Sequence, residues 1–154
     1  AGRWKRGPAR SRYRRVMELH QSLKDAIDAG VHGHLATVNP DGSPQVTVVW
    51  IGRDGDDLLV AHMGSGQKMR NLARDPRCTV SFELDGVSGP GLMNYAVLHA
   101  TAVVTEGGAP ELLRELAPRF MGEGVKFPPM DEPPPGRVAR LTVHRVTGMG
   151  PWVS

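Results

Sequence analysis

The residues best suited to chemistry in this chain are a short polar segment, Gly64-Ser65-Gly66-Gln67-Lys68, and Arg70 just after it. The segment leads into an apolar pattern that predicts a helix over residues 67–74. The first N–H groups of a helix have no partner within it, and the helix dipole places partial positive charge at the same end. A lysine in the first turn adds a full charge. The segment therefore predicts a site that holds an anion such as a phosphate group.

The elements that position this segment follow from β-rich runs and from turn residues. Residues 39–42, Asn-Pro-Asp-Gly, predict a tight reversal, because Asp-Gly accepts the positive φ angles that such a turn needs. The expected strands are residues 34–38, 43–51, 58–62, 78–84, 94–106 and 137–146. The expected helices are residues 12–29, 67–74 and 110–120, with loops at 85–93 and 121–136. In the second helix, Met69, Leu72 and Ala73 should form the apolar side, and Asn71 another face.

The composition is that of an ordinary globular domain. A chain of 154 residues, 40% hydrophobic and 23% charged, is expected to form one domain with one core. No apolar run approaches the roughly 20 residues needed to cross a bilayer, and no secretory signal pattern is visible, so we expect a cytoplasmic protein. Cys78, the single cysteine, lies in an apolar run and is expected to be a buried strand residue.

Positive charge is concentrated at the start of the chain. Seven cations precede residue 16, and they are Arg3, Lys5, Arg6, Arg10, Arg12, Arg14 and Arg15. We interpret residues 1–15 as a basic N-terminal arm and residues 16–154 as the folded domain. Such an arm is a solvated tail, a cover for an anionic ligand, or a nucleic-acid contact. Nucleic acid is the least favoured of the three, because no recognised nucleic-acid fold follows.

The order of the elements, together with particular residues, resembles the split-barrel flavin and deazaflavin oxidoreductases, a superfamily that includes pyridoxamine 5′-phosphate oxidase. The residues that carry the resemblance are 35–38, Asp41-Gly42, Pro44, 46–50, 68–72 and Asp75-Pro76. It covers most of the chain from Leu19 onward and is similar above all to the branch that uses coenzyme F420, an 8-hydroxy-5-deazaflavin. The resemblance implies a mainly β fold of the FMN-binding split β-barrel type. It also implies a homodimer with two cofactor sites at the subunit interface.

The choice of cofactor can be argued from positions that carry cations in the oxidase. There an arginine and a lysine flank the strand that corresponds to residues 46–51, but this chain has Val46 and Ile51. The helix entry, Arg-Lys in the oxidase, is Gln67-Lys68 here. One lysine matches the singly charged phosphodiester of a deazaflavin better than the doubly charged phosphate of FMN. We therefore expect coenzyme F420, with FMN as the alternative and haem or no redox cofactor as the remaining reading.

The resemblance also implies which residues touch the cofactor. The implied cofactor-binding residues are Thr47, Val48, Val49, Trp50, His62, Met63, Ser65, Gly66, Gln67, Lys68, Arg70 and Trp152. Residues 47–50 resemble the strand that lies under the ring system, where backbone groups would bond to ring nitrogens. Two tryptophans, Trp50 and Trp152, are candidates for stacking, although Trp152 is equally a candidate anchor at a dimer interface.

These residues lead to a hypothesis about function. We expect an oxidoreductase that transfers a hydride between coenzyme F420 and a conjugated or quinone-like small molecule. The cofactor carries that chemistry, so no side chain has to be a nucleophile. Asn94 and Tyr95 are substrate-pocket candidates, and Tyr95 is a candidate proton donor. The alternatives are an FMN-dependent reductase or oxidase of the same fold and a flavin carrier without turnover.

Metal chemistry is not expected. The histidines at 20, 34, 62, 99 and 144 are interpreted as structural or surface residues, not as haem ligands. Their spacing with Cys78 offers no zinc motif.

Overall fold

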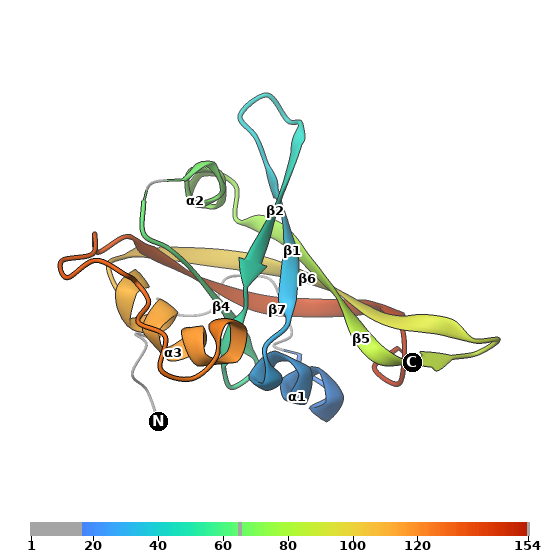
Figure 1. The fold of residues 1–154 in the computed structure, drawn as a ribbon. Helices are drawn as coiled ribbons and strands as arrows, with labels where there is room; N and C mark the ends of the chain where they lie inside the picture. The colour runs from blue at the N-terminus through green and yellow to red at the C-terminus, as the bar shows by residue number, and fades with distance from the viewer. Residues whose placement is uncertain (1–16, 65, 154) are drawn as a thin grey trace.

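The computed structural model describes residues 17–64 and 66–153. Over these residues the chain forms one curled, antiparallel, seven-stranded sheet with three helices around it (Figure 1). The strands are β1 (His32–Val38), β2 (Pro44–Trp50), β3 (Gly52–Asp54), β4 (Asp57–His62), β5 (Arg77–Ser88), β6 (Leu92–Glu106) and β7 (Arg137–Met149). The helices are α1 (Gln21–Ala29), α2 (Gln67–Arg74) and α3 (Ala109–Met121). The order of the strands across the sheet is β2-β1-β5-β6-β7-β4-β3, so β2 and β3 are the edge strands. This mainly β architecture with flanking helices is the predicted fold class.

The apolar core fills the inside of the curled sheet. Strand β1 alternates buried and half-buried residues, with Leu35 fully buried, and β5 does the same with Val80 and Phe82. This period of two is what places one side of each strand in the core. Helix α1 adds Leu23 and Ile27 to the same core, and α2 adds Met69 and Leu72. Because α2 buries Met69 and Leu72 in this core, its position relative to the sheet is fixed by packing.

The start of α1 differs from the prediction. The helix begins at Gln21, and residues 17–20 are not helical, because the His20 ring accepts the N–H of Ser22 and caps the helix at that point. The predicted residues 12–16 lie outside the described residues. At the other end, Gly30 has a positive φ of 99° and donates its N–H to Ile27. The predicted helix end is therefore confirmed.

The predicted loop over residues 85–93 is wrong. Strands β5 and β6 continue as a paired hairpin to Ser88 and Leu92, with a bulge between Glu83 and Val87. The glycines that predicted a loop serve the bulge and the tight turn instead, since Gly86 and Gly91 have positive φ angles of 94° and 96°. The result is the long hairpin that projects from the sheet in Figure 1. Strand β7 is likewise longer than predicted and reaches Met149.

A second, smaller apolar cluster lies between α3 and the outer side of β4. It contains Leu59, Leu112, Leu116 and Val138. Gly52 packs closely against this cluster, since a Cβ there would lie 3.1 Å from the Leu116 side chain and that side chain would have to shift slightly. The proline-dense segment after α3 forms neither helix nor strand, as predicted. None of the described helices is long and apolar enough to cross a membrane.

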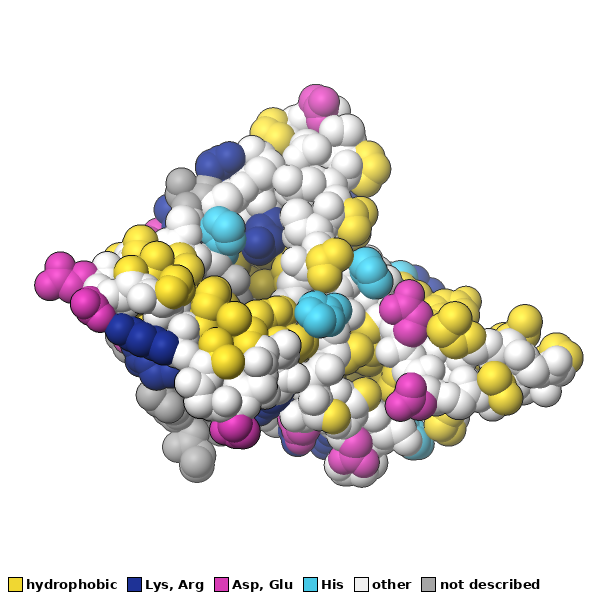
Figure 2. Space-filling model, viewed as in Figure 1, with side chains coloured by type: hydrophobic (Ala, Val, Ile, Leu, Met, Phe, Trp, Pro, Cys, Tyr) yellow, Lys and Arg dark blue, Asp and Glu magenta, His cyan; other side chains and the backbone are white. Residues whose placement is uncertain are grey.

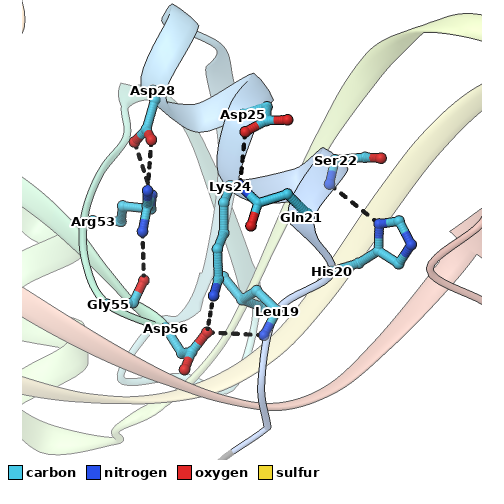
Figure 3. A network of polar contacts seen from close by, with 10 residues as sticks. All are labelled: Leu19, His20, Gln21, Ser22, Lys24, Asp25, Asp28, Arg53, Gly55 and Asp56. Atoms are coloured by element: carbon cyan, nitrogen blue, oxygen red, sulfur yellow. Dashed lines mark hydrogen bonds and ion pairs between the residues drawn. The ribbon is translucent and has the colours of Figure 1, made fainter.

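Ion pairs fix α1 to the turn between β3 and β4 (Figure 3). Arg53 contacts both carboxylate oxygens of Asp28, at 2.8 and 2.6 Å. Asp56 accepts the backbone N–H of Leu19 at 3.0 Å and pairs with Lys24 at 3.1 Å. Residues 52–54 pair with β4 as strand β3, so the turn between these strands consists of residues 55 and 56.

Candidate functional site

The start of α2 is the centre of the candidate site. The helix begins at Gln67, as predicted, and Gly66 precedes it without any side-chain hydrogen bond to the first turn. The first turn carries no acidic residue. Figure 2 shows the surface notched between α2 and the β1–β2 hairpin, with basic and histidine side chains beside the notch. The backbone N–H groups of this turn are thus available to an anion.

Lys68 supplies the full positive charge of this turn. Its side chain is half-buried, and its Nζ lies 3.2 Å from Nδ1 of His62, the last residue of β4. Because an ammonium group only donates, Nδ1 accepts, and the imidazole in this contact is neutral. Burial lowers the pKa of Lys68, while burial and the charge of Lys68 lower the pKa of His62. Within the described part of the chain, no carboxylate forms an ion pair with Lys68.

The His62 ring lies in the space that a side chain at position 66 would need. A Cβ built on Gly66 would lie 2.6 Å from Nε2 of His62, which is too close for any real contact. The backbone φ of Gly66 is −55°, so the constraint comes from space and not from backbone conformation. At Gly64 the corresponding distance is 3.4 Å, an ordinary contact. The glycine at 66 therefore allows the ring to reach Lys68.

Asn71 holds α2 against the β1–β2 hairpin, and here the sequence prediction is wrong. Asn71 is fully buried, whereas Ala73, which was expected on the apolar side, is exposed. The Nδ2 group of Asn71 donates to Thr37 at 3.0 Å and to Asn39 at 2.9 Å, and its Oδ1 accepts from Gln67 at 2.7 Å. Buried polar groups need such partners. This network joins α2 to β1 and to the turn that follows it.

Arg70 and Arg74 lie on the rim of α2. Arg70 is exposed and donates to Oε1 of Gln67 at 2.7 Å. Arg74 donates to the carbonyl of Val38. Gln67 and Arg70 are therefore joined to each other beside Lys68. Met63 is half-buried in the turn after β4, and Ser65 lies outside the described residues.

Strand β2 contains a buried hydroxyl group that has no hydrogen-bond partner in the part of the chain that the structure describes. The Thr47 Oγ1 atom is buried and has no hydrogen-bond partner among the described residues. The next two side chains alternate in exposure, as in a strand with one face in the core: Val48 is 63% exposed, and Val49 is buried in the core. Because β2 is an edge strand, half of its backbone groups also point away from β1. The strand thus offers both a side-chain group and backbone groups to a ligand.

The two tryptophans lie in different surroundings. Trp50 stacks on Phe120 of α3, with ring centroids 4.8 Å apart and planes 3° apart, and also contacts Phe127 at 5.2 Å. Trp152 is buried near the C-terminus and donates its Nε1–H to the carbonyl of Tyr95 at 3.2 Å. Both rings therefore already have partners within the chain.

Tyr95 and Trp152 lie far from Lys68 along the sheet. Tyr95 pairs with Met149 at one end of β7, whereas His62 pairs with Arg137 at the other end. Twelve residues of strand separate these ends, which is roughly 40 Å along the strand. A shallow cavity of about 210 Å³ lies at the Tyr95 end, lined by Ser81, Phe82, Glu83, Met93 and Tyr95. Asn94 is buried beside it and accepts from Ser88 at 2.6 Å. One chain therefore does not bring all the predicted site residues together.

Cys78 and the histidines other than His62 show no sign of a reactive site. Cys78 is buried as predicted, and burial raises the pKa of its thiol to about 12. Among the other histidines, His34 lies 3.3 Å from the Ser81 carbonyl, His99 lies 3.3 Å from Thr147, and His144 contacts Thr101. No group of three histidine, cysteine, aspartate or glutamate side chains in the described ranges is arranged to hold a metal ion.

Comparison with known proteins identifies the class of this fold. The family model described as pyridoxamine 5′-phosphate oxidase matches residues 19–150, so the chain belongs to that family. This confirms the resemblance at the level of the superfamily. No curated protein matches the chain.

Solved structures extend the comparison. The chain is similar to an F420 reductase, with 26% identity, 76% of this chain and 89% of the other covered, and a TM-score of 0.61. It shares its fold with the conserved hypothetical protein Rv2991 of Mycobacterium tuberculosis, at 24% identity, 86% coverage of each chain and a TM-score of 0.64. It also shares its fold with HutZ, the heme storage protein of Vibrio cholerae, at 18% identity, coverage of 87% and 96%, and a TM-score of 0.59.

Proposed function

We propose that this chain is an oxidoreductase that binds coenzyme F420 and transfers a hydride between it and a conjugated or quinone-like small molecule. The observation that carries the proposal is the single half-buried lysine at the uncapped start of α2, which contacts a neutral imidazole and no carboxylate. A half-buried cation without an acidic partner has lost part of its hydration without gaining a counter-charge, which supports an anionic ligand at this place. The similarity to an F420 reductase supports the choice of coenzyme.

The charge of the site fits a phosphodiester. The oxidase cations correspond to Val46, which is 61% exposed, and to Ile51, which is fully buried in the core. Neither position supplies a second cation to the ligand. One lysine and the N–H groups of α2 match one negative charge, whereas the phosphate of FMN carries two near neutral pH.

The chain's own residues have distinct roles in this proposal. Lys68 and the first N–H groups of α2 hold the phosphodiester, and the Thr47 hydroxyl gains the hydrogen bond that it lacks in the free protein. The edge of β2 supplies backbone groups to the ring system. The bound coenzyme supplies the hydride chemistry, while the protein positions both reactants and excludes water.

A homodimer is part of the proposal. Large apolar side chains are exposed on two parts of the sheet: Val46 and Val48 on β2, and Val87, Leu92, Met93 and Tyr95 on the long hairpin. Several large apolar side chains exposed on an edge strand and on a projecting hairpin support an interaction surface there. A second copy that covers it would let Tyr95 and Trp152 of one subunit approach Lys68 of the other. Tyr95 is then the candidate proton donor to the substrate.

Two further points belong to the same proposal. The basic arm, residues 1–15, lies outside the described residues, and we propose that it contacts the anionic glutamyl tail of the coenzyme and not nucleic acid. A lone buried cysteine suits a reducing compartment, which supports a cytoplasmic location.

A spectrum and a turnover assay test the function. The purified protein is loaded with reduced F420, and its oxidation is followed by absorbance after addition of a quinone such as menadione. Quinone-dependent oxidation above the rate with free coenzyme supports the proposal. Turnover with reduced FMN alone would favour the FMN enzyme of the same fold, and tight binding without turnover would favour a carrier. A haem spectrum in the purified protein would contradict all three.

A further inference from the structure

The contact between His62 and Lys68 has a consequence for ligand binding. The two side chains come from different elements, the end of β4 and the first turn of α2, and their nitrogen atoms lie 3.2 Å apart. If both were charged, they would repel each other at this distance. The free protein therefore keeps Lys68 charged and His62 neutral, in agreement with the lowered pKa of His62.

The backbone leaves room for His62 in this contact. The ring lies in the space that a Cβ at position 66 would need, so the glycine there allows the ring to reach Lys68. Across the β4–β7 pair, His62 lies opposite Arg137, whose charge is matched by Glu106 at 2.9 Å. From α2 the charge that acts on the imidazole is that of Lys68. The pKa of His62 is thus lowered first by burial and then by the charge of Lys68, and only the second cause can be cancelled by an anion.

An anion bound to Lys68 reverses this balance. An anion that accepts a hydrogen bond from Nζ would lie within about 6 Å of the imidazole. At that distance its charge offsets the repulsion between Lys68 and a protonated His62, so the charged form of the ring becomes more favourable. We propose that anion binding at Lys68 is coupled to the uptake of one proton by His62: the Lys68 ammonium turns its hydrogen bond from Nδ1 to the anion, and Nδ1 takes up the proton, so that His62 becomes a second cation of the site. This inference rests on the proposed function for the identity of the anion, but the coupling itself requires only an anion at Lys68.

The sign of the pH dependence follows from linkage. Protonated His62 is more stable in the complex than in the free protein, so the affinity for the anion rises as pH falls from the ordinary histidine pKa, about 6.5, toward the lowered pKa of His62 in the free protein. A difference of one pKa unit between free and bound protein corresponds to a tenfold change in affinity.

The first experiment measures protons with the coenzyme. Calorimetric titration of the full chain with F420 at pH 6 and pH 8, in buffers of different ionisation enthalpy, gives the number of protons taken up. The matched variant is His62→Asn, whose amide oxygen can accept from Lys68 but cannot take a proton. Wild type should take up more protons than the variant at pH 6, with several-fold tighter binding relative to pH 8. Equal proton uptake by wild type and variant would overturn the coupling, while the proposed function would stand.

The second experiment does not need the coenzyme. The titration of the His62 ring proton is followed by NMR in sodium sulfate and in sodium chloride at the same ionic strength, because sulfate keeps its charge throughout this pH range. The midpoint should rise in sulfate by about half a unit or more. In Lys68→Met the midpoint should already be higher in chloride, and sulfate should add little. A His62 midpoint that ignores sulfate would overturn the inference. Failure of F420 to bind would instead overturn the proposed function.

Discussion

Replacing Lys68 with methionine removes the charge of the site and keeps most of its apolar stem. In the proposed complex the ammonium group makes a charge-assisted hydrogen bond to the phosphodiester, which is worth about 1.5–3 kcal/mol. Affinity for F420 should therefore fall by about one to two powers of ten. The free energy of unfolding should not decrease, because burial already disfavours the charge of Lys68, and the hydrogen bond that is lost is one to the neutral ring of His62.

The assay for this prediction is a fluorescence titration with F420, run beside a thermal melt of each variant. Lys126→Met is the matched control, since Lys126 is an exposed lysine paired with Asp131 in the proline-dense segment. Its affinity should equal that of wild type. If Lys68→Met retains a wild-type melting curve and wild-type affinity, the reasoning that places the phosphodiester on Lys68 is refuted.

Two further predictions concern the supports of the site, and a third concerns the ion pairs that hold α1. Gly66→Ala should displace the His62 ring and weaken F420 binding about tenfold in the same titration, whereas Gly64→Ala should bind normally; equal affinities would contradict the role of the glycine. Asn71→Leu should lower the free energy of unfolding in urea by about 2–3 kcal/mol, because its buried partners lose their hydrogen bonds; the exposed Ala73→Leu is the control, and similar stability of both variants would contradict the buried network. For Asp56, burial raises the pKa, but the Leu19 N–H and Lys24 outweigh it, so the pKa is lowered. The stabilisation by Asp56 is present above the carboxyl's unfolded pKa, about 3.9, and is lost as pH falls through the lower folded value. Asp56→Asn should therefore lose less stability than wild type between about pH 5 and pH 2, and parallel acid curves would exclude this contribution.

Local features of the fold could be predicted from the sequence. The turn at Asp41-Gly42 and the helix end at Gly30 depend on φ angles that glycine accepts, and both are as predicted. Helix α2 has the predicted bounds because its apolar spacing and the following Pro76 are local signals. Lys68 in its first turn was therefore placed correctly from the sequence alone.

Features that depend on contacts between distant segments could not be predicted. Asn71 was expected on a polar face, but its partners come from residues 37 and 39, more than thirty residues away in the chain. The contact of His62 with Lys68 has a weak local signal, a histidine that ends a strand six residues before a lysine in a helix start. The stacking of Trp50 on Phe120 of α3 has no signal in either segment. The long hairpin was missed because glycines in a bulge resemble glycines in a loop.

The central claim is that this chain binds a deazaflavin and that Lys68 holds its phosphodiester. The most direct measurement is a paired fluorescence titration of the purified full chain with F420 and with FMN at pH 7.5, where His62 is neutral in the free protein. F420 should bind at least tenfold more tightly than FMN, and Lys68→Met should weaken F420 binding by about one to two powers of ten. Tighter binding of FMN, or wild-type affinity for F420 in a folded Lys68→Met, would contradict the claim.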